Sequence, residues 1–185
     1  IGPSGSGKST LLKAMAGLMP KFGGIVTGGQ ILLDGQDIQP VAPFERAKRV
    51  AMLFQNPDRQ FAMRTAPEQI SFALENIQLP AEQIQDRVAD VMTRLNLTAF
   101  AEQDLMTLSG GEKQRVALAT ILAMDSDIIL LDEPFANVDP QARQALLHDL
   151  QALQQTQGKT IVISDHDLSG YAELVDNLYV LEATT

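Results

Sequence analysis

The chain has 185 residues, and its 23 acidic residues outnumber its 14 Lys and Arg, which gives a formal net charge of −9 at pH 7. Hydrophobic residues make up 45% and charged residues 20% of the chain, which is typical of a folded domain and excludes a disordered or fibrous protein. The acidic excess argues against sequence-independent nucleic-acid binding, which needs a basic surface. The absence of cysteine excludes disulfides and thiolate metal sites and favours a reducing compartment.

The first ten residues predict a phosphate-binding loop followed by a helix. Residues 2–10 read GPSGSGKST, which fits the pattern Gly-x-x-x-x-Gly-Lys-Ser in full. Glycines let backbone N–H groups turn inward around phosphate oxygens, while Lys8 reaches the β- and γ-phosphates and the Ser9 hydroxyl is a ligand for Mg²⁺. A glycine- and serine-rich loop without a ligand is the alternative. We expect nucleotide binding by Gly2, Pro3, Ser4, Gly5, Ser6, Gly7, Lys8, Ser9 and Thr10.

Such a loop normally follows a buried strand, of which Ile1 alone is present, so we expect the chain to be a fragment that is truncated at both ends. No apolar run approaches the ~20 residues of a membrane helix, and no signal peptide is expected.

The elements expected next alternate around a helical middle. A helix over 11–16 ends at Gly17, a strand over 31–33 precedes an Asp34-Gly35 turn, and a strand covers 49–54. Residues from about 66 to 124 have an almost entirely helical pattern. Strands at 127–131, 160–164 and 178–181 then alternate with helices at 140–156 and 168–174. This order predicts an α/β fold with a mostly parallel sheet, a core at 1–60 and 125–185, and a helical subdomain at about 61–124.

Two carboxylates follow the strand that precedes residue 132. Residues 127–134 read DIILLDEP, in which four apolar residues predict a strand buried on both faces. Asp132 and Glu133 emerge at its carboxyl end, where open α/β sheets bind their ligands. We expect Asp132 to hold Mg²⁺ through water and Glu133 to act as a general base on the attacking water. The alternative is a pair of solvated acids at a strand end.

A third motif, LSGGEKQR at residues 108–115, opens the last helix of the middle region. Ser109 is a good N-cap, and Glu112 completes a capping box. Gly110 and Gly111 lower helix propensity but allow backbone N–H groups to approach an anion. The residues alone leave both interpretations open, a helix cap and a phosphate site.

Together, GPSGSGKST, LSGGEKQR, ILLDEP and the following Val138-Asp139 resemble the ATP-binding subunit of ABC transporters over nearly the whole chain. The resemblance implies a P-loop NTPase core with an inserted helical subdomain, which binds ATP and Mg²⁺ and hydrolyses ATP. It implies that Gln55 senses Mg²⁺ and the attacking water, and that His166 contacts the γ-phosphate. It also implies a sandwich dimer with an identical or paralogous second subunit, across which Asp139 communicates.

In that dimer, the resemblance implies that Ser109, Gly110 and Gly111 act on the nucleotide of the partner subunit. The stretch FQNPDRQF at 54–61 is similar to that of energy-coupling-factor importers, which take up vitamins or transition-metal ions. A transmembrane subunit is then expected to dock at Asp58–Ile77, on the cytoplasmic face of the membrane. Phe61 and Met63 precede the helix of this segment and can stay exposed for that subunit; the alternative is that the apolar residues of the segment belong only to the core.

Two other classes of protein share these motifs. A soluble ABC-type ATPase of DNA repair, chromosome maintenance or translation is the main alternative. The compact helical region, the absence of cysteine and the net charge argue against it, and no nucleic-acid partner is expected. A regulatory nucleotide-binding module without turnover is the other alternative, against which Glu133 and His166 argue.

Overall fold

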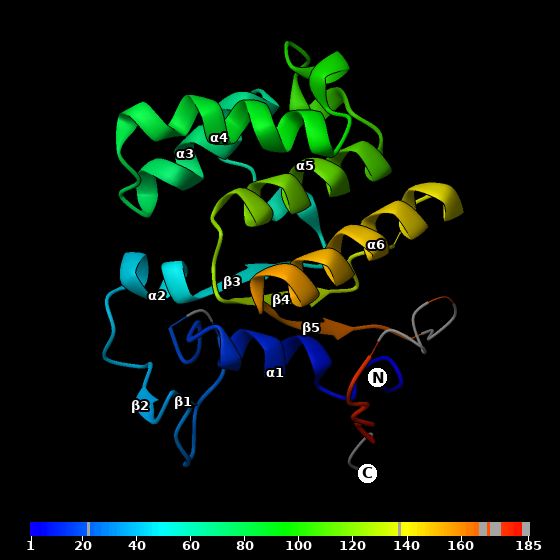
Figure 1. Ribbon diagram of the computed structural model, residues 1–185. Coiled ribbons are helices and arrows are strands. Elements are labelled where there is room, and N and C mark those ends of the chain that lie inside the picture. The colour runs from blue at the N-terminus through cyan, green and yellow to red at the C-terminus, as the bar shows by residue number, and fades with distance from the viewer. Residues whose placement is uncertain (22, 137, 167–169, 171–174, 183–185) are drawn as a thin grey trace.

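A parallel sheet of three strands lies at the centre of the computed structural model, which describes residues 1–21, 23–136, 138–166, 170 and 175–182. The strand order is β3 (Val50–Leu53), β4 (Ile128–Asp132) and β5 (Thr160–Ser164), and both pairings are parallel (Figure 1). The register places Asp132 opposite Ser164 at the carboxyl end. The predicted parallel sheet is therefore confirmed.

Helices cover both faces of this sheet because side chains of successive strand residues point to opposite faces. Val50, Met52 and Leu130 belong to a small apolar cluster with α1 (Lys8–Met15). Ala51 and Leu53, from the other face, belong to a larger core with α5 (Gly110–Ala123) and α6 (Pro140–Gln157). Figure 1 shows α1 on one side of the sheet and α5 and α6 on the other.

The middle of the chain is helical, as its spacing predicts. The helices α3 (Ala66–Asn76) and α4 (Ala81–Arg94) pack on each other and on α5, and the short 3₁₀ turns η2 (Thr98–Phe100) and η3 (Leu105–Thr107) precede α5. Ile70 and Leu74 of α3 are fully buried in the larger core. This core continues without a break from the helices to the sheet, and the domain bounds at 61 and 124 stay a prediction.

Several elements differ from the prediction. The helix α2 (Pro43–Arg49) is not predicted, because it has only seven residues and none of them is buried. The strand expected at 31–33 is shorter, with β1 (Leu32–Leu33) pairing with β2 (Gln36–Asp37) across a turn. Asp34 and Gly35 in that turn have φ of 51° and 78°, which confirms the tight turn.

The strand predicted at 178–181 is wrong, because no continuous ladder forms there. The amino group of Ile1 donates to the Tyr179 carbonyl at 2.7 Å, and the Leu181 N–H donates to the Ile1 carbonyl at 2.8 Å. Among the described residues, Ile1 alone is hydrogen-bonded to the main chain of this segment, which is too little for a strand. The helix predicted at 168–174 lies outside the described residues, apart from Gly170. Among the described helices, none has the length and apolar character needed to span a bilayer.

Candidate functional site

The phosphate-binding pattern forms a loop that leads directly into α1. Gly7 is the N-cap of this helix, with φ of 91°, and Gly5 has φ of 82°. Both are left-handed conformations that glycine adopts without strain. A Cβ atom at either position would have no heavy atom within 4 Å, so open space borders the loop at the helix N-terminus. This arrangement suits an anion, because the first backbone N–H groups of a helix have no partner within it.

Two polar side chains lie inside the loop. Lys8 is buried, and its ammonium donates to the carbonyl oxygens of Gly2 at 2.8 Å and Pro3 at 3.0 Å. The Ser6 hydroxyl oxygen is buried and has no hydrogen-bond partner within the described part of the chain. A buried cation and an unpartnered hydroxyl fit phosphate oxygens as ligands.

Asp132 and Glu133 lie at the carboxyl end of β4 as predicted, and Ser164 of β5 makes a hydrogen bond with each of them. Asp132 is 2% exposed, and its Oδ1 accepts a hydrogen bond from the Ser164 hydroxyl at 2.5 Å. Glu133 has φ of 48°, and its N–H donates to the Ser164 carbonyl at 3.0 Å. This left-handed residue directs the chain out of the strand. Ser164 is a site residue that the sequence interpretation missed, and its signal is a polar residue at the end of the apolar strand 160–164.

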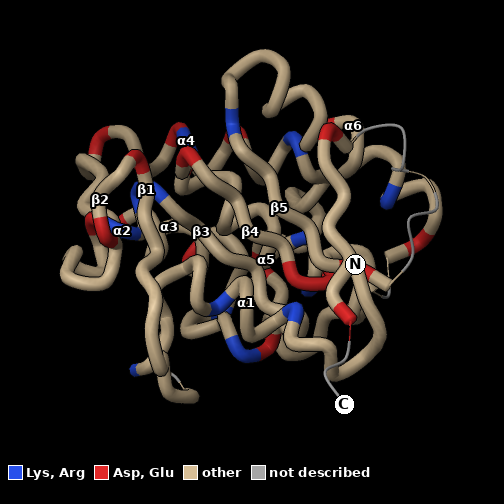
Figure 2. The backbone as a smooth tube through the Cα atoms, turned by 90° about the horizontal axis from the view of Figure 1, so that it is seen from below, with Lys and Arg blue, Asp and Glu red and all other residues tan. Residues whose placement is uncertain are grey.

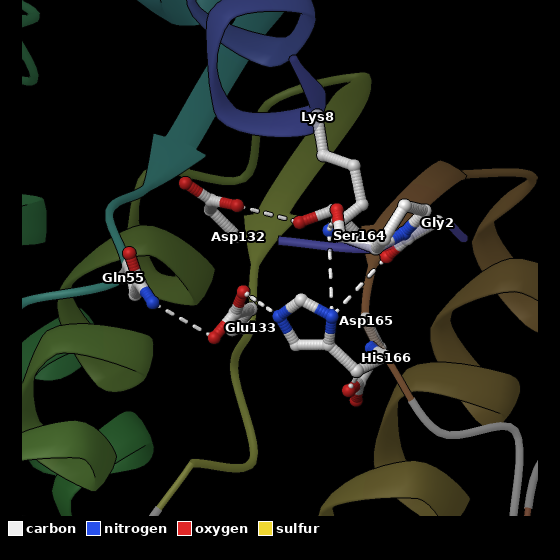
Figure 3. A network of polar contacts seen from close by, with 9 residues as sticks. Gly2, Lys8, Gln55, Asp132, Glu133, Ser164, Asp165 and His166 are labelled. Atoms are coloured by element: carbon white, nitrogen blue, oxygen red, sulfur yellow. Dashed lines mark hydrogen bonds and ion pairs between the residues drawn. The ribbon is translucent and has the colours of Figure 1, made fainter. Parts of the chain in front are cut away.

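Glu133 is the centre of a polar network that joins the ends of three strands (Figure 3). Its Oε2 accepts from the Gln55 amide at 2.8 Å, and its Oε1 lies 2.7 Å from Nε2 of His166. A carboxylate only accepts, so Nε2 of His166 is the donor. Nδ1 of His166 lies 3.5 Å from the Lys8 ammonium and 3.2 Å from the Gly2 carbonyl oxygen. The structure thus brings together three of the predicted site residues and places them beside the loop.

The residues predicted for a metal offer oxygen donors of three kinds. These are the half-buried Ser9 hydroxyl on α1, the Gln55 amide after β3 and the Asp132 carboxylate at the end of β4. Oxygen donors are those that Mg²⁺ prefers, and its sites usually combine one or two carboxylates with substrate phosphates. The donor set therefore fits Mg²⁺.

The third motif forms the helix cap that the sequence predicts. The Ser109 N–H and hydroxyl both donate to Glu112 Oε2 at 2.7 Å, and the Glu112 N–H donates back to the Ser109 hydroxyl oxygen at 3.4 Å. The hydrogen bonds from Ser109 lower the pKa of Glu112. The capping box is confirmed, while a phosphate-binding role stays a prediction.

A surface hollow of about 430 Å³ joins this turn to the start of α6. Asp139 caps α6 by accepting from the N–H groups of Gln141 at 3.1 Å and Ala142 at 3.0 Å. Within the described ranges, no hydrogen bond or ion pair links the side chains of Ser109 or Asp139 to the Glu133 network. The predicted site residues therefore form two groups. The hollow is lined by Ser109, Gly110, Gly111, Glu112, Arg115, Val138, Asp139 and Ala142.

The segment predicted for docking forms one wall of a larger groove of about 590 Å³. Phe61 and Phe72 line this groove together with Phe44 of α2 and Ile121 of α5, and Met63 is not among its lining residues. Phe61 and Met63 are both half-buried, and Phe61 packs against the larger core. The two side chains are therefore only partly exposed, between the two alternatives that the sequence left open.

Comparison with known proteins agrees with this geometry. Residues 1–136 match the family model described as ABC transporter. The chain is 36% identical over 183 residues to the putative HMP/thiamine import ATP-binding protein YkoD of Bacillus subtilis, covering 98% of this chain and 34% of that protein. It is 38% identical over 182 residues to the energy-coupling factor transporter ATP-binding protein EcfA1 of Levilactobacillus brevis, covering 98% of this chain and 63% of that protein.

The chain thus spans between about a third and two thirds of the length of these relatives. A solved structure of the ATP-binding cassette MJ0796, a dimer in a post-hydrolysis state with ADP and Pi, matches with a TM-score of 0.85 and 27% identity. The match covers 100% of this chain and 81% of that one. With the phosphate loop, the carboxylates after β4 and the capped LSGG turn in place, this chain belongs to the ABC transporter family, as an ATP-binding domain.

Proposed function

We propose that this chain binds and hydrolyses ATP as part of a motor subunit of an ABC importer. The observation that carries the proposal is the contact of Glu133 with both Gln55 and His166, beside the loop that holds Lys8. The loop N–H groups and Lys8 bind the ATP phosphates, and Glu133 accepts a proton from the attacking water. Gln55 orients that water, and His166 contacts the γ-phosphate.

Ser9, Gln55 and Asp132 are the residues that would hold Mg²⁺, with Asp132 acting through water. When bound there, Mg²⁺ neutralises charge on the β- and γ-phosphates. The protein holds these oxygen atoms in position. For Asp132, the Ser164 hydroxyl does this by donating a hydrogen bond of 2.5 Å to Oδ1.

The working unit of the proposal is a sandwich of two ATP-binding subunits. Ser109 and Gly111 lie in the hollow with Asp139, apart from the Glu133 network of the same chain. Placed against a second subunit, the LSGG turn faces the γ-phosphate of the partner's nucleotide, and Asp139 lies at the contact between subunits. The dimeric form of the similar cassette MJ0796 supports this arrangement. Hydrolysis breaks the bond between the γ-phosphate and ADP, so the link that the γ-phosphate makes between the halves is lost and the dimer opens.

The transporter is an energy-coupling-factor type that imports a vitamin or a metal ion, with this chain at the cytoplasmic face of the membrane. The FQNPDRQF stretch and the likeness to EcfA1 and to an HMP/thiamine import protein support this subtype. The groove lined by Phe44, Phe61 and Phe72 is where a transmembrane subunit docks, because half-buried aromatic side chains there offer an anchoring surface.

The charge distribution weighs against a DNA-repair, chromosome or translation ATPase. The net charge is −9, and Figure 2 shows basic residues interspersed with acidic ones along the chain rather than gathered in one stripe. A polyphosphate backbone needs a basic surface, so nucleic acid is not a partner in this proposal.

The substitution Glu133→Gln tests the proposed chemistry. The amide keeps the shape of the side chain but lacks its basicity, so we expect ATP turnover to fall by about 10²-fold or more while ATP affinity is retained. Steady-state phosphate release and nucleotide affinity, measured on the full-length protein, check this. Near-normal phosphate release from the variant would remove Glu133 from the role of general base.

A further inference from the structure

The segment that follows Gln55 contains η1 (Pro57–Arg59) and is anchored by two side-chain amides that lie after this turn. The side-chain amide of Gln60 makes two hydrogen bonds to the main chain at the end of β3. It accepts from the Phe54 N–H at 3.0 Å and donates to the Met52 carbonyl oxygen at 3.0 Å. The buried Gln69 of α3 donates to the Gln60 carbonyl at 3.2 Å. The chain is therefore fixed before Gln55 and after η1, and the short turn lies between the two anchors.

One ion pair connects this turn to the helix that carries the LSGG motif. The Lys113 ammonium lies 2.9 Å from Asp58 Oδ1, with the Lys113 side chain 13% exposed and the Asp58 side chain 45% exposed. Lys113 is in the first turn of α5, where its N–H donates to the Ser109 carbonyl at 2.9 Å. This ion pair thus joins the residues after Gln55 to the helix whose first turn begins at Ser109.

In the proposed dimer, Gln55 and Ser109 contact different nucleotides. Gln55 donates to Glu133 in the subunit's own site, at 2.8 Å. Ser109 lies in the hollow that we assign to the partner's γ-phosphate. We propose that the Asp58–Lys113 ion pair is a positioning device that couples ATP bound at a subunit's own site to the LSGG turn offered to its partner. This inference rests on the proposed ATP-driven dimer.

The geometry gives the coupling a physical route. Only two residues separate Gln55 from Asp58, so a shift of Gln55 towards nucleotide moves the turn, which is held at Gln60. The Lys113 side chain is only 13% exposed, so salt screens this pair less than a fully exposed one. Movement of Asp58 is therefore transmitted through Lys113 to the first turn of α5.

The test is Lys113→Gln in the full-length protein with a Glu133→Gln background that prevents turnover. We expect the ATP affinity of the monomer to stay within about twofold, while the ATP concentration for half-maximal dimer formation rises about fivefold or more, as for sites coupled by ~1 kcal/mol. The exchanged pair Asp58→Lys with Lys113→Asp restores the original concentration. Equilibrium nucleotide titration and size-exclusion chromatography with Mg-ATP measure the two quantities.

A matched control breaks an ion pair elsewhere. Arg94→Gln removes the Arg94–Asp90 contact of 3.7 Å on α4 and changes neither quantity. Unchanged dimer formation by Lys113→Gln, or failure of the exchanged pair to restore it, overturns the coupling role. If the background protein itself forms no dimer with ATP, the proposed sandwich fails and the coupling fails with it. The two failures are therefore distinguishable.

Discussion

At the scale of single residues, the site depends on a few hydrogen bonds made in buried surroundings. Asp132 is almost fully buried, and its Oδ1 accepts a hydrogen bond from the Ser164 hydroxyl. A buried carboxylate without donors is costly, so this hydroxyl contributes to stability as well as to the direction of the carboxylate.

We therefore predict that Ser164→Ala lowers the free energy of unfolding by about 1–3 kcal/mol, because it leaves a buried acceptor unsatisfied. Urea unfolding measures this, with Ser71→Ala at a half-buried position of α3 as the control. We also expect the variant to need a higher Mg²⁺ concentration for ATP hydrolysis. Unchanged unfolding midpoints for Ser164→Ala would show that another group satisfies Asp132.

The predictable part of the site is the part carried by contiguous motifs. The loop with Lys8 and the carboxylates after β4 lie where the sequence places them, because a glycine pattern and an apolar strand each determine local geometry. Ser164 and the Asp58–Lys113 pair could not be predicted. Their partners lie 32 and 55 residues away in sequence, and only the packed fold brings them together.

At the scale of elements, helices with caps were easier to predict than short strands and exposed helices. The helix predicted at 140–156 is present as α6, Pro140–Gln157, with Asp139 as its N-cap and Gly158 as its C-cap at φ of 65°. The helix α2 has no buried residue, so its sequence carries no hydrophobic period. The segment at 178–181 has strand-like residues, but within the described part of the chain its main-chain hydrogen bonds are with Ile1.

The cap of α6 gives a prediction that separates folding from function. Asp139→Ala removes an acceptor of two backbone N–H groups and should lower the free energy of unfolding by about 1 kcal/mol, whereas Asp139→Asn should keep most of it. Thermal or urea unfolding measures both variants. If ATP-driven dimer formation is lost in Asp139→Asn while stability is retained, Asp139 acts between subunits. Equal stability of Asp139→Ala and the original protein would contradict the cap.

At the scale of the whole molecule, the candidate nucleotide site and the candidate docking groove lie on different parts of the fold. The carboxyl edge of the sheet carries Asp132 and Glu133, while the groove between α2, α3 and α5 is apolar and has no member of the Glu133 network. Gln60 connects the groove to the sheet, because it lines the groove and donates a hydrogen bond to the Met52 carbonyl of β3. A partner in the groove therefore lies next to the residues that follow Gln55.

The last prediction concerns that partner. Phe72→Ser removes a half-buried aromatic side chain from the groove, and we expect co-purification with the transmembrane subunit to fall about tenfold or more, because aromatic anchors dominate binding at interfaces. The ATPase rate of the isolated protein should remain within about twofold. Met63→Ser is the matched control, since Met63 belongs to the same segment but does not line the groove.

Phe44→Ser on the opposite wall should reproduce the effect of Phe72→Ser, which guards against a local folding defect in α3. Normal co-purification of both groove variants would show that the transmembrane subunit docks elsewhere. Loss for Met63→Ser with retention for Phe72→Ser would place the contact on the segment before α3 and outside the groove. DNA binding at physiological salt would contradict the importer assignment itself, because a chain of net charge −9 gains nothing from phosphate contacts unless it offers a dedicated basic surface.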